Sequence, residues 1–387
     1  MTHQVTHQVP AYHRRSRPKR LVAVAVALSA FGAVALAAPA ASGQPSHRPH
    51  RGYREFDFVS NLPGRATATD PNLVNPWGLS RLNGVVWVSD NGSDKATTYT
   101  GARPGKPARV LRRVVTIPGA GAPTGNVRND THGFRFRAFG RSGAARIIFS
   151  GEEGDLFAWS PRVSRRTAVR VAHTETGGVN AVYKGLTLVP SHREWAASRR
   201  HRHQPRLLVA NFRDARVDVF DARFHRLPSH RFRDPSIPSG FAPFNIRAFG
   251  SRVFVTYAKQ DPAKHDDVAG AGNGFIDVFD LHGRLLRHFA RRGVLNSPWG
   301  MELAPRHFGK FSGDLLVGNF GDGRIHAFNP RTGHLAGTLR DSKGKPISIP
   351  GLWGLLRGSH KARQDAVWFA AGINGEQDGL LGIVRAN

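Results

Sequence analysis

The stretch Leu295-Asn296-Ser297-Pro298-Trp299-Gly300 contains a Pro-x-Gly motif that occurs, in imperfect form, six times along the chain. The last residues of successive copies lie 47, 60, 60, 55 and 54 residues apart. A repeat of this length built from short strands is typical of β-propeller blades. The six copies are Pro76-Trp77-Gly78, Pro123-Thr124-Gly125, Tyr183-Lys184-Gly185, Pro243-Phe244-Asn245, Pro298-Trp299-Gly300 and Leu352-Trp353-Gly354.

Each copy is followed by a second apolar segment and then by a third segment in which apolar and polar residues alternate. The alternation is clearest in 216–221, 275–280 and 323–328. A period of two indicates half-buried strands, and the Gly, Asp and Asn residues between the segments indicate tight turns. No long amphipathic helical pattern is present in the body of the chain. We therefore predict an all-β fold, a six-bladed β-propeller.

The last copy supplies only three strands, at 352–357, 367–371 and 380–385. One further strand, 53–59, precedes the first copy. We predict that this N-terminal strand completes the last blade, which closes the ring and removes an exposed sheet edge. The chain has no cysteine, so the ring must close without disulfides.

The N-terminal region is predicted to direct export. A basic stretch precedes an apolar run at 21–38, and a small-residue cleavage site follows, which together indicate a secretory signal peptide over residues 1–42. An uncleaved anchor is the alternative, since the run approaches spanning length. We expect a linker at 43–52, a propeller at 53–387, and a secreted chain with no lipid-modified cysteine and no transmembrane segment after removal of the signal.

The chain is strongly basic, with 56 Lys and Arg residues against 27 Asp and Glu residues, a formal net charge of +29. Such a surface attracts polyanions, for example an anionic cell-envelope or extracellular polymer. The charge is spread along the whole chain, which also fits the residue usage of a GC-rich genome. Nothing in the sequence indicates specific recognition of nucleic acid, and we expect a monomer.

The repeats resemble those of uncharacterised exported bacterial propeller proteins related to NHL-repeat and TolB-like propellers. The resemblance covers roughly residues 55–385 and departs from the pattern at 131–142 and 191–206. It implies a six-bladed propeller outside the cytoplasm and no assigned reaction. The matching segments are 70–79, 88–92, 181–186, 242–246, 255–261, 272–275, 295–300 and 317–323.

In propellers of this kind, the Pro-x-Gly turn and the loop after the second strand lie on one face and surround the central channel. We expect a ligand to bind there, at residues drawn from all six blades. The candidate ligand-binding residues are Asn75, Trp77, Asp90, Asn91, Glu152, Asn211, Phe244, Lys259, Gln260, Asp261, Trp299, Asn319 and Trp353.

Two interpretations of these residues stay open. Carboxylates and amides from different blades would suit Ca²⁺, which takes six to eight oxygen ligands; the same residue types also cap their own turns. The four aromatic residues either stack on a flat ligand or pack together in the protein. The candidate calcium ligands are Asp90, Glu152, Asn211, Asp261 and Asn319.

The segment 261–273 is an insertion after the second strand of the fourth copy, so we expect it to overhang this face, either as a lid or metal-binding loop or as a solvated loop. The sequence contains no Gly-x-Ser-x-Gly, His-Glu-x-x-His or phosphate-loop signature. We therefore expect a secreted binding or scaffold propeller with no certain cofactor. The alternative is a calcium-dependent hydrolase of the lactonase or esterase type, with the metal in the central channel.

Overall fold

The computed structural model of the chain describes residues 52–102, 108–119, 121–189, 205–358 and 365–387. The predicted signal peptide and the predicted linker lie outside these residues, apart from Gly52. The described chain forms strands together with short 3-10 helices such as η1 (Asn91–Ser93) and η3 (Gly309–Phe311). No helix in these ranges is long and apolar enough to cross a membrane. The predicted all-β class is confirmed.

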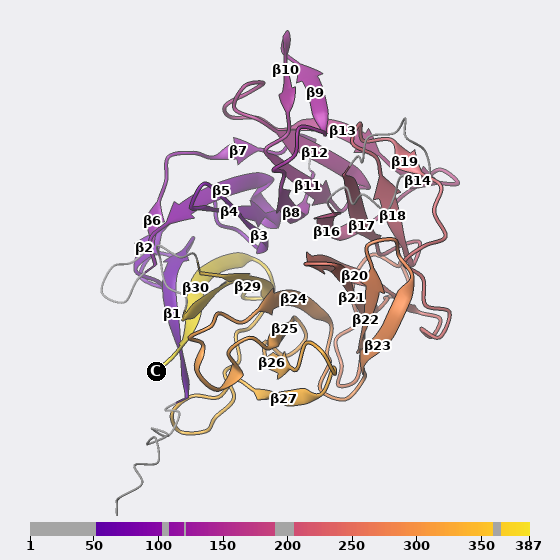
Figure 1. Ribbon diagram of the computed structural model, residues 1–387. Helices are drawn as coiled ribbons and strands as arrows, with labels where there is room; N and C mark the ends of the chain where they lie inside the picture. Colours follow the sequence, from indigo (N-terminus) through magenta and orange to yellow (C-terminus); the bar gives the residue numbers. More distant parts are fainter. Residues whose placement is uncertain (1–51, 103–107, 120, 190–204, 359–364) are drawn as a thin grey trace, which may run out of the picture. The chain divides into compact units, whose positions relative to one another are not determined.

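Six sheets are arranged as the blades of a ring around a central channel, as predicted (Figure 1). Blade one contains β3 (Pro76–Leu82), β4 (Val85–Asp90), β5 (Lys95–Thr100), β6 (Arg109–Val110) and β7 (Val115–Thr116). Blade two contains β8 (Pro123–Arg128), β11 (Ile147–Gly151), β12 (Asp155–Trp159) and β13 (Val169–His173). Blade three contains β16 (Tyr183–Val189), β17 (Arg206–Asn211), β18 (Arg216–Phe220) and β19 (Arg226–Leu227).

The last three blades follow the same inner-to-outer order. Blade four contains β20 (Phe241–Phe249), β21 (Arg252–Lys259), β22 (Gly274–Asp280) and β23 (Leu285–Arg291). Blade five contains β24 (Pro298–Leu303), β25 (Leu315–Asn319), β26 (Ile325–Phe328) and β27 (Leu335–Thr338). Blade six contains β28 (Leu352–Arg357), β29 (Ala366–Ile373), β30 (Asp378–Ala386), β1 (Tyr53–Ser60) and β2 (Ala68–Thr69). Two small hairpins lie outside the blades, β9 (Arg135–Ala138) with β10 (Arg141–Ala144) and β14 (Glu175–Thr176) with β15 (Val179–Asn180).

The ring closes through the N-terminal strand, as predicted. β1 pairs antiparallel with β30, from Tyr53 opposite Ala386 to Ser60 opposite Leu380. The hydroxyl of Tyr53 also donates a hydrogen bond to the carbonyl oxygen of Phe308 in blade five, at 3.0 Å. The two ends of the described chain therefore hold each other in one sheet, where they complete the sixth blade.

The second copy departs from the sequence pattern because it carries an insertion. Residues 131–142 were expected to break the repeat, and the structure places most of them in the β9–β10 hairpin between the first and second strands of blade two. The four blade strands themselves are intact. The apparent degeneracy of this copy is thus an added hairpin, and the blade is complete.

The glycine of the motif lets neighbouring inner strands approach each other. The inner strands contact one another in the cyclic order β3, β8, β16, β20, β24, β28 and back to β3. A Cβ atom on Gly78 would lie 2.6 Å from the carbonyl oxygen of Thr124, and one on Gly300 would lie 2.6 Å from that of Trp353. Both distances are too short for a real side chain, so the close approach requires glycine.

Blade four has Asn245 in place of this glycine, and the side chain bridges to the next blade. Its Nδ2 donates a hydrogen bond to the carbonyl oxygen of Trp299 at 2.6 Å, and its Oδ1 accepts one from the backbone N–H of Ile246 at 2.8 Å. On the other side, a Cβ atom on Gly185 would overlap Asn245. The Asn245 amide therefore joins two neighbouring inner strands by a hydrogen bond, at the position where other blades have a glycine in close contact with the next strand.

Replacing Gly300 by Ala should lower the free energy of unfolding, because the new Cβ atom forces the inner strands of blades five and six apart. We expect a loss of about 1–3 kcal/mol, the usual cost of overpacking. Chemical denaturation of both variants tests this. Gly143→Ala is the matched control, since its Cβ atom would lie no closer than 3.4 Å to Ser160; equal stability of the two variants would contradict the packing argument.

Candidate functional site

All six inner strands run in the same direction along the channel. Gly78 lies beside Thr124–Asn126, and Gly125 lies beside Lys184–Leu186, so equivalent positions face each other around the ring. The channel therefore has two chemically different ends. We call the end where the inner strands begin the turn mouth, and the end where they finish the arginine mouth.

The predicted aromatic residues meet at the turn mouth and pack against one another. The rings of Trp77 and Trp353 stack with their centroids 3.5 Å apart, and Phe320 stacks on Trp353 at 4.0 Å. Trp299 meets Trp353 edge to face at 5.7 Å, and Phe244 belongs to the same buried cluster. The structure therefore shows these aromatic residues packed together in the protein, which is one of the two interpretations that the sequence left open.

Lys184 lies in the middle of this aromatic cluster. It takes the central position of the third motif copy, where four other copies have an aromatic residue, and its side chain is 1% exposed. Its Nζ lies 5.0 Å from the centroid of the Trp77 ring and 5.9 Å from that of Phe212. A buried ammonium needs a partner charge, and Lys184 has two: an ion pair with Glu152 and one with Asp266 at 3.3 Å.

Predicted polar residues extend this network around the turn mouth. Asn91 Nδ2 donates a hydrogen bond to Glu152 Oε2 at 2.9 Å, and Asn75 Nδ2 donates one to Asn91 Oδ1 at 3.3 Å. On the far side, Trp353 Nε1 donates to Glu376 at 3.2 Å, and burial raises the pKa of that carboxyl. Side chains from blades one, two, three and six are thereby joined at one end of the channel.

The 261–273 insertion covers this network, since it brings Asp266 onto Lys184. The hydrogen bond between His265 Nδ1 and Asp266 Oδ1, 3.0 Å long, lowers the pKa of Asp266 to about 2 and raises the pKa of His265. Burial acts to lower the pKa of Lys184, but the carboxylates of Glu152 and Asp266 outweigh it and raise that pKa. Lys184 therefore stays protonated between its two carboxylates.

The five predicted calcium ligands do not come together. Glu152 alone reaches the Lys184 network. Asp90 is fully buried near Thr97, where burial raises its pKa well above the ordinary value. The other three side chains bind within their own turns and blades: Asn211 to Asp214 and Asp218, Asn319 to Val294 and Asp322, and Asp261 to the backbone N–H groups of His265 and Asp266.

The two remaining predicted residues lie at the edge of the turn mouth. Lys259 is exposed, and Gln260 Nε2 donates a hydrogen bond to the carbonyl oxygen of Phe212 at 2.6 Å. A group that does have metal-binding spacing is Glu152, His265 and Asp266, whose ligand atoms lie within 4.8 Å of one another. Lys184 already forms ion pairs with both carboxylates of that group, so a metal ion would have to displace an ammonium.

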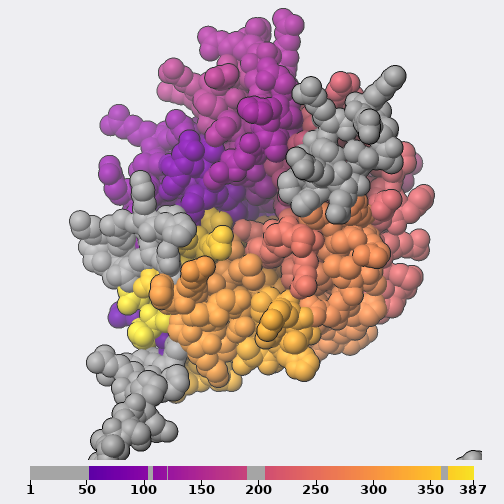
Figure 2. Space-filling model, viewed as in Figure 1, coloured from indigo at the N-terminus to yellow at the C-terminus, as the bar shows by residue number. Residues whose placement is uncertain are grey.

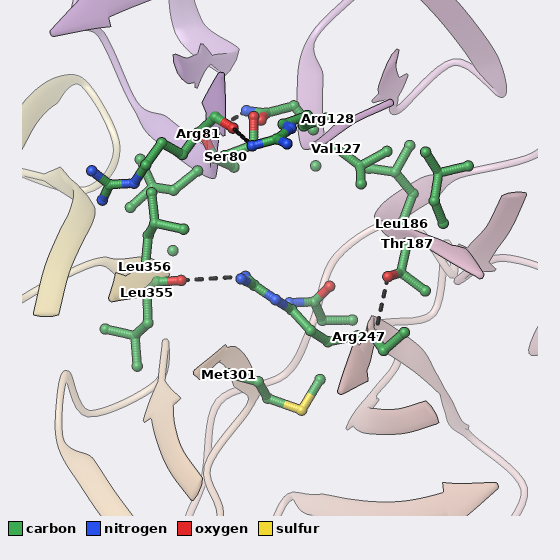
Figure 3. Close-up of a pocket in the computed structure, with 18 of the residues that line it drawn as sticks. Ser80, Arg81, Val127, Arg128, Leu186, Thr187, Arg247, Met301, Leu355 and Leu356 are labelled. Atoms are coloured by element: carbon green, nitrogen blue, oxygen red, sulfur yellow. Dashed lines mark hydrogen bonds between the residues drawn. The ribbon is translucent and has the colours of Figure 1, made fainter. Parts of the chain in front are cut away.

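The opposite half of the channel contains a cavity of about 280 Å³ that borders a wider cavity of about 860 Å³. Arg81, Arg128 and Arg247 line both, and Figure 3 shows them at different points around the opening. They come from β3, β8 and β20. Arg306 and Arg357 line the wider cavity. This is the arginine mouth, and its residues were not predicted.

Backbone and acidic groups hold these arginines in place. Arg247 forms a 2.8 Å ion pair with Glu302, which is 4% exposed, and its second terminal nitrogen lies 3.4 Å from the carbonyl oxygen of Leu355. Arg81 donates a hydrogen bond to the carbonyl oxygen of Arg357 at 2.8 Å. Burial and the charge of Arg357 lower the pKa of Arg81, against the opposing effect of Glu302. The mouth therefore carries more positive charge than its own acid neutralises.

The sequence did contain a signal for this mouth. Arg81, Arg128 and Arg357 each lie three residues after the glycine of their motif copy, where blades three and five have Leu188 and Leu303. An inner strand places that position at the far end of the channel. Three arginines at the same repeat position are therefore predicted to lie at the same end of the channel. The net charge of the chain does not give this information.

The six blades and their shared channel define the chain as a six-bladed β-propeller. No family model matches the chain. The uncharacterized proteins R648 and L690 of Acanthamoeba polyphaga mimivirus are 30% and 32% identical to it over 332 and 334 residues, which cover 84% of this chain in both cases and 78% and 83% of those proteins. The chain belongs to the same family as these two viral proteins.

Solved structures give only a distant likeness. A virginiamycin B lyase of Staphylococcus aureus is 9% identical, with 86% of this chain and 98% of that chain covered and a TM-score of 0.44. A protein of unknown function from Bacteroides thetaiotaomicron is 9% identical, with 87% and 73% covered and a TM-score of 0.49. The propeller part of the resemblance is confirmed. Its bacterial and exported parts stay predictions, because the two family members named above are viral.

Replacing Lys184 by Met should destabilise the protein strongly, because it leaves Glu152 charged, buried and unpaired. We expect the free energy of unfolding to fall by about 3–5 kcal/mol. Adding Glu152→Gln should recover part of that loss, so the double variant is more stable than the sum of the single effects predicts. Denaturant titrations measure this. Lys259→Met, which removes an exposed lysine near the same mouth, should change little; a similar loss in both lysine variants would refute the role of the pair.

Proposed function

We propose that the protein is a binding propeller and that its ligand is an anionic molecule held at the arginine mouth. The observation that carries this proposal is the placement of Arg81, Arg128 and Arg247 around one end of the channel, beside a cavity large enough for an anionic group. The guanidinium group is planar and presents paired N–H donors, which suit phosphate, sulfate and carboxylate oxygens.

The balance of charge supports the same proposal. Five arginines line the two cavities, and Glu302 is the acidic residue in their lining. Glu302 is nearly buried and bonded to Arg247, so it orients that guanidinium without cancelling the remaining ones. A wide outer cavity that narrows inward suits a group projecting from a larger chain. An anionic polymer is therefore the class of ligand that we favour.

Removing two charges from the arginine mouth should weaken binding of a polyanion. For the variant Arg81→Gln with Arg128→Gln we expect about tenfold lower affinity for inorganic polyphosphate, and a smaller slope of log affinity against log salt, by about two. Both residues are chosen because the ion pair of the buried Glu302 is formed by Arg247 and stays in place. Fluorescence anisotropy over a salt series measures the affinity and the slope.

The matched control removes the same charge at the other end of the channel, with Lys259→Gln and Lys264→Gln, both exposed. This control should keep nearly the affinity of the unaltered chain. If both double variants lose affinity equally, binding follows net charge alone and the arginine mouth is not the site.

A calcium-dependent hydrolase is the second candidate, favoured by the metal-binding spacing of Glu152, His265 and Asp266. We rank it lower because the ammonium of Lys184 occupies the carboxylates that a metal would need. Adding Ca²⁺ to the purified chain should therefore leave its melting temperature unchanged, and elemental analysis should find no bound Ca²⁺. One tightly held Ca²⁺ per chain with a raised melting temperature would reverse the ranking.

A further inference from the structure

The β9–β10 hairpin projects from blade two and ends in an exposed aromatic residue. Ala138 pairs with Arg141, so the turn consists of Phe139 and Gly140. The side chain of Phe139 is the most exposed large apolar group among the described residues, at 68%. The hairpin extends beyond the blades in Figure 1, and its purple to magenta atoms project in Figure 2. It follows the inner strand β8, so it arises on the face of the arginine mouth.

The turn conformation is unfavourable for phenylalanine. Phe139 and Gly140 have φ angles of 50° and 71°, which define a two-residue turn with both residues left-handed. Asn-Gly is the preferred sequence for such a turn, and blade one uses it between its first two strands: Asn83 and Gly84, with φ angles of 53° and 79°, connect β3 to β4. A bulky side chain in this region of φ costs free energy.

Other phenylalanines of the chain also have positive φ, but burial compensates them. Phe134, Phe224 and Phe232 are 0%, 5% and 2% exposed, and each packs in a hydrophobic cluster. Phe139 combines the same backbone cost with a ring left in water. The protein gains nothing inside its own fold from phenylalanine at this position, so the gain is to be sought in contact with a partner.

We propose that the β9–β10 hairpin docks the propeller onto an anionic lipid surface, with Phe139 inserted among the headgroups. Residues 131–151 contain four arginines and no acidic residue. Three of them, Arg135, Arg137 and Arg141, are exposed on the hairpin. An aromatic tip enters the boundary between headgroups and acyl chains, while flanking cations contact the lipid phosphates.

A lipid surface fits this tip better than a protein partner does. The turn presents one large apolar side chain between Ala138 and Gly140, with Arg141 and Ser142 next to it, and it forms no extended apolar patch. A stable protein interface buries about 800 Å² on each partner, whereas a bilayer requires only a small inserted group with favourable charge around it. The inference rests on the proposed function in one respect, that the partner of this face is anionic.

Vesicle binding by the full chain tests the proposal, with Phe139→Asn as the decisive variant. Asparagine suits the turn, so the variant should melt at the same temperature as the unaltered chain or higher. Its binding to vesicles of phosphatidylcholine and phosphatidylglycerol in equal parts should fall about tenfold, since insertion of the ring is lost. Phe139→Trp should retain binding, and vesicles of phosphatidylcholine alone should bind none of the variants tightly. Co-sedimentation measures the binding of the unaltered chain and of both variants to each kind of vesicle.

Leu286→Asn is the control, because Leu286 is 45% exposed on β23 of another blade; it should bind as the unaltered chain does. Polyphosphate binding separates this proposal from the previous one: Phe139→Asn should keep it, while the double variant of Arg81 and Arg128 should lose it. Unchanged vesicle binding by Phe139→Asn overturns the lipid proposal, and so does the absence of any vesicle binding by the unaltered chain. If Phe139→Asn is then more stable than the unaltered chain, a protein partner would be the remaining explanation for Phe139.

Discussion

Close backbone contact between neighbouring inner strands is the constraint on which the rest of this structure depends. Gly78, Gly185, Gly300 and Gly354 each face the next inner strand at a distance that admits no Cβ atom, and a Cβ atom on Gly125 would lie 3.1 Å from the backbone nitrogen of Leu186. Because every blade is held at this spacing, the channel is narrow. The residue before each glycine is then directed to the same end of the channel, where bulky side chains must meet. The aromatic cluster follows from the glycine contacts as much as from its own ring stacking.

The narrow channel also explains the ion pairs at the turn mouth. The third copy places Lys184 where other copies place an aromatic ring, so its ammonium lies among Trp77, Phe212 and their neighbours, away from water. An isolated charge there would be very costly. Glu152 from the adjacent blade and Asp266 from the insertion compensate it, and Asn91 and His265 hold these two carboxylates in position. The turn mouth is thus closed by packing, and its buried ammonium is paired with carboxylates.

The sequence predicted the features that depend on spacing and alternation. The six inner strands, the closing strand predicted at 53–59 and the meeting of Trp77, Trp299 and Trp353 all follow from the repeat. The sequence did not predict that Lys184 is buried at the channel, because lysine usually lies on the surface and no neighbouring residue indicates its burial. Nor did it separate Glu152 from Asp90, since both lie where a second strand ends. Only the fold decides which carboxylate reaches the channel and which is buried beside Thr97.

The two ends of the channel differ in how their charges are satisfied. At the turn mouth the buried ammonium of Lys184 is paired with Glu152 and Asp266, so a ligand there would have to break ion pairs before making its own contacts. At the arginine mouth Arg128 forms an ion pair with the exposed Asp130, whereas Arg81 donates its hydrogen bond to a carbonyl oxygen and forms no ion pair with a described residue. An approaching anion loses no existing ion pair with Arg81 and gains several donors. Arg81, Arg128 and Arg247 therefore form a basic group at one end of the ring, on the face from which the Phe139 hairpin arises.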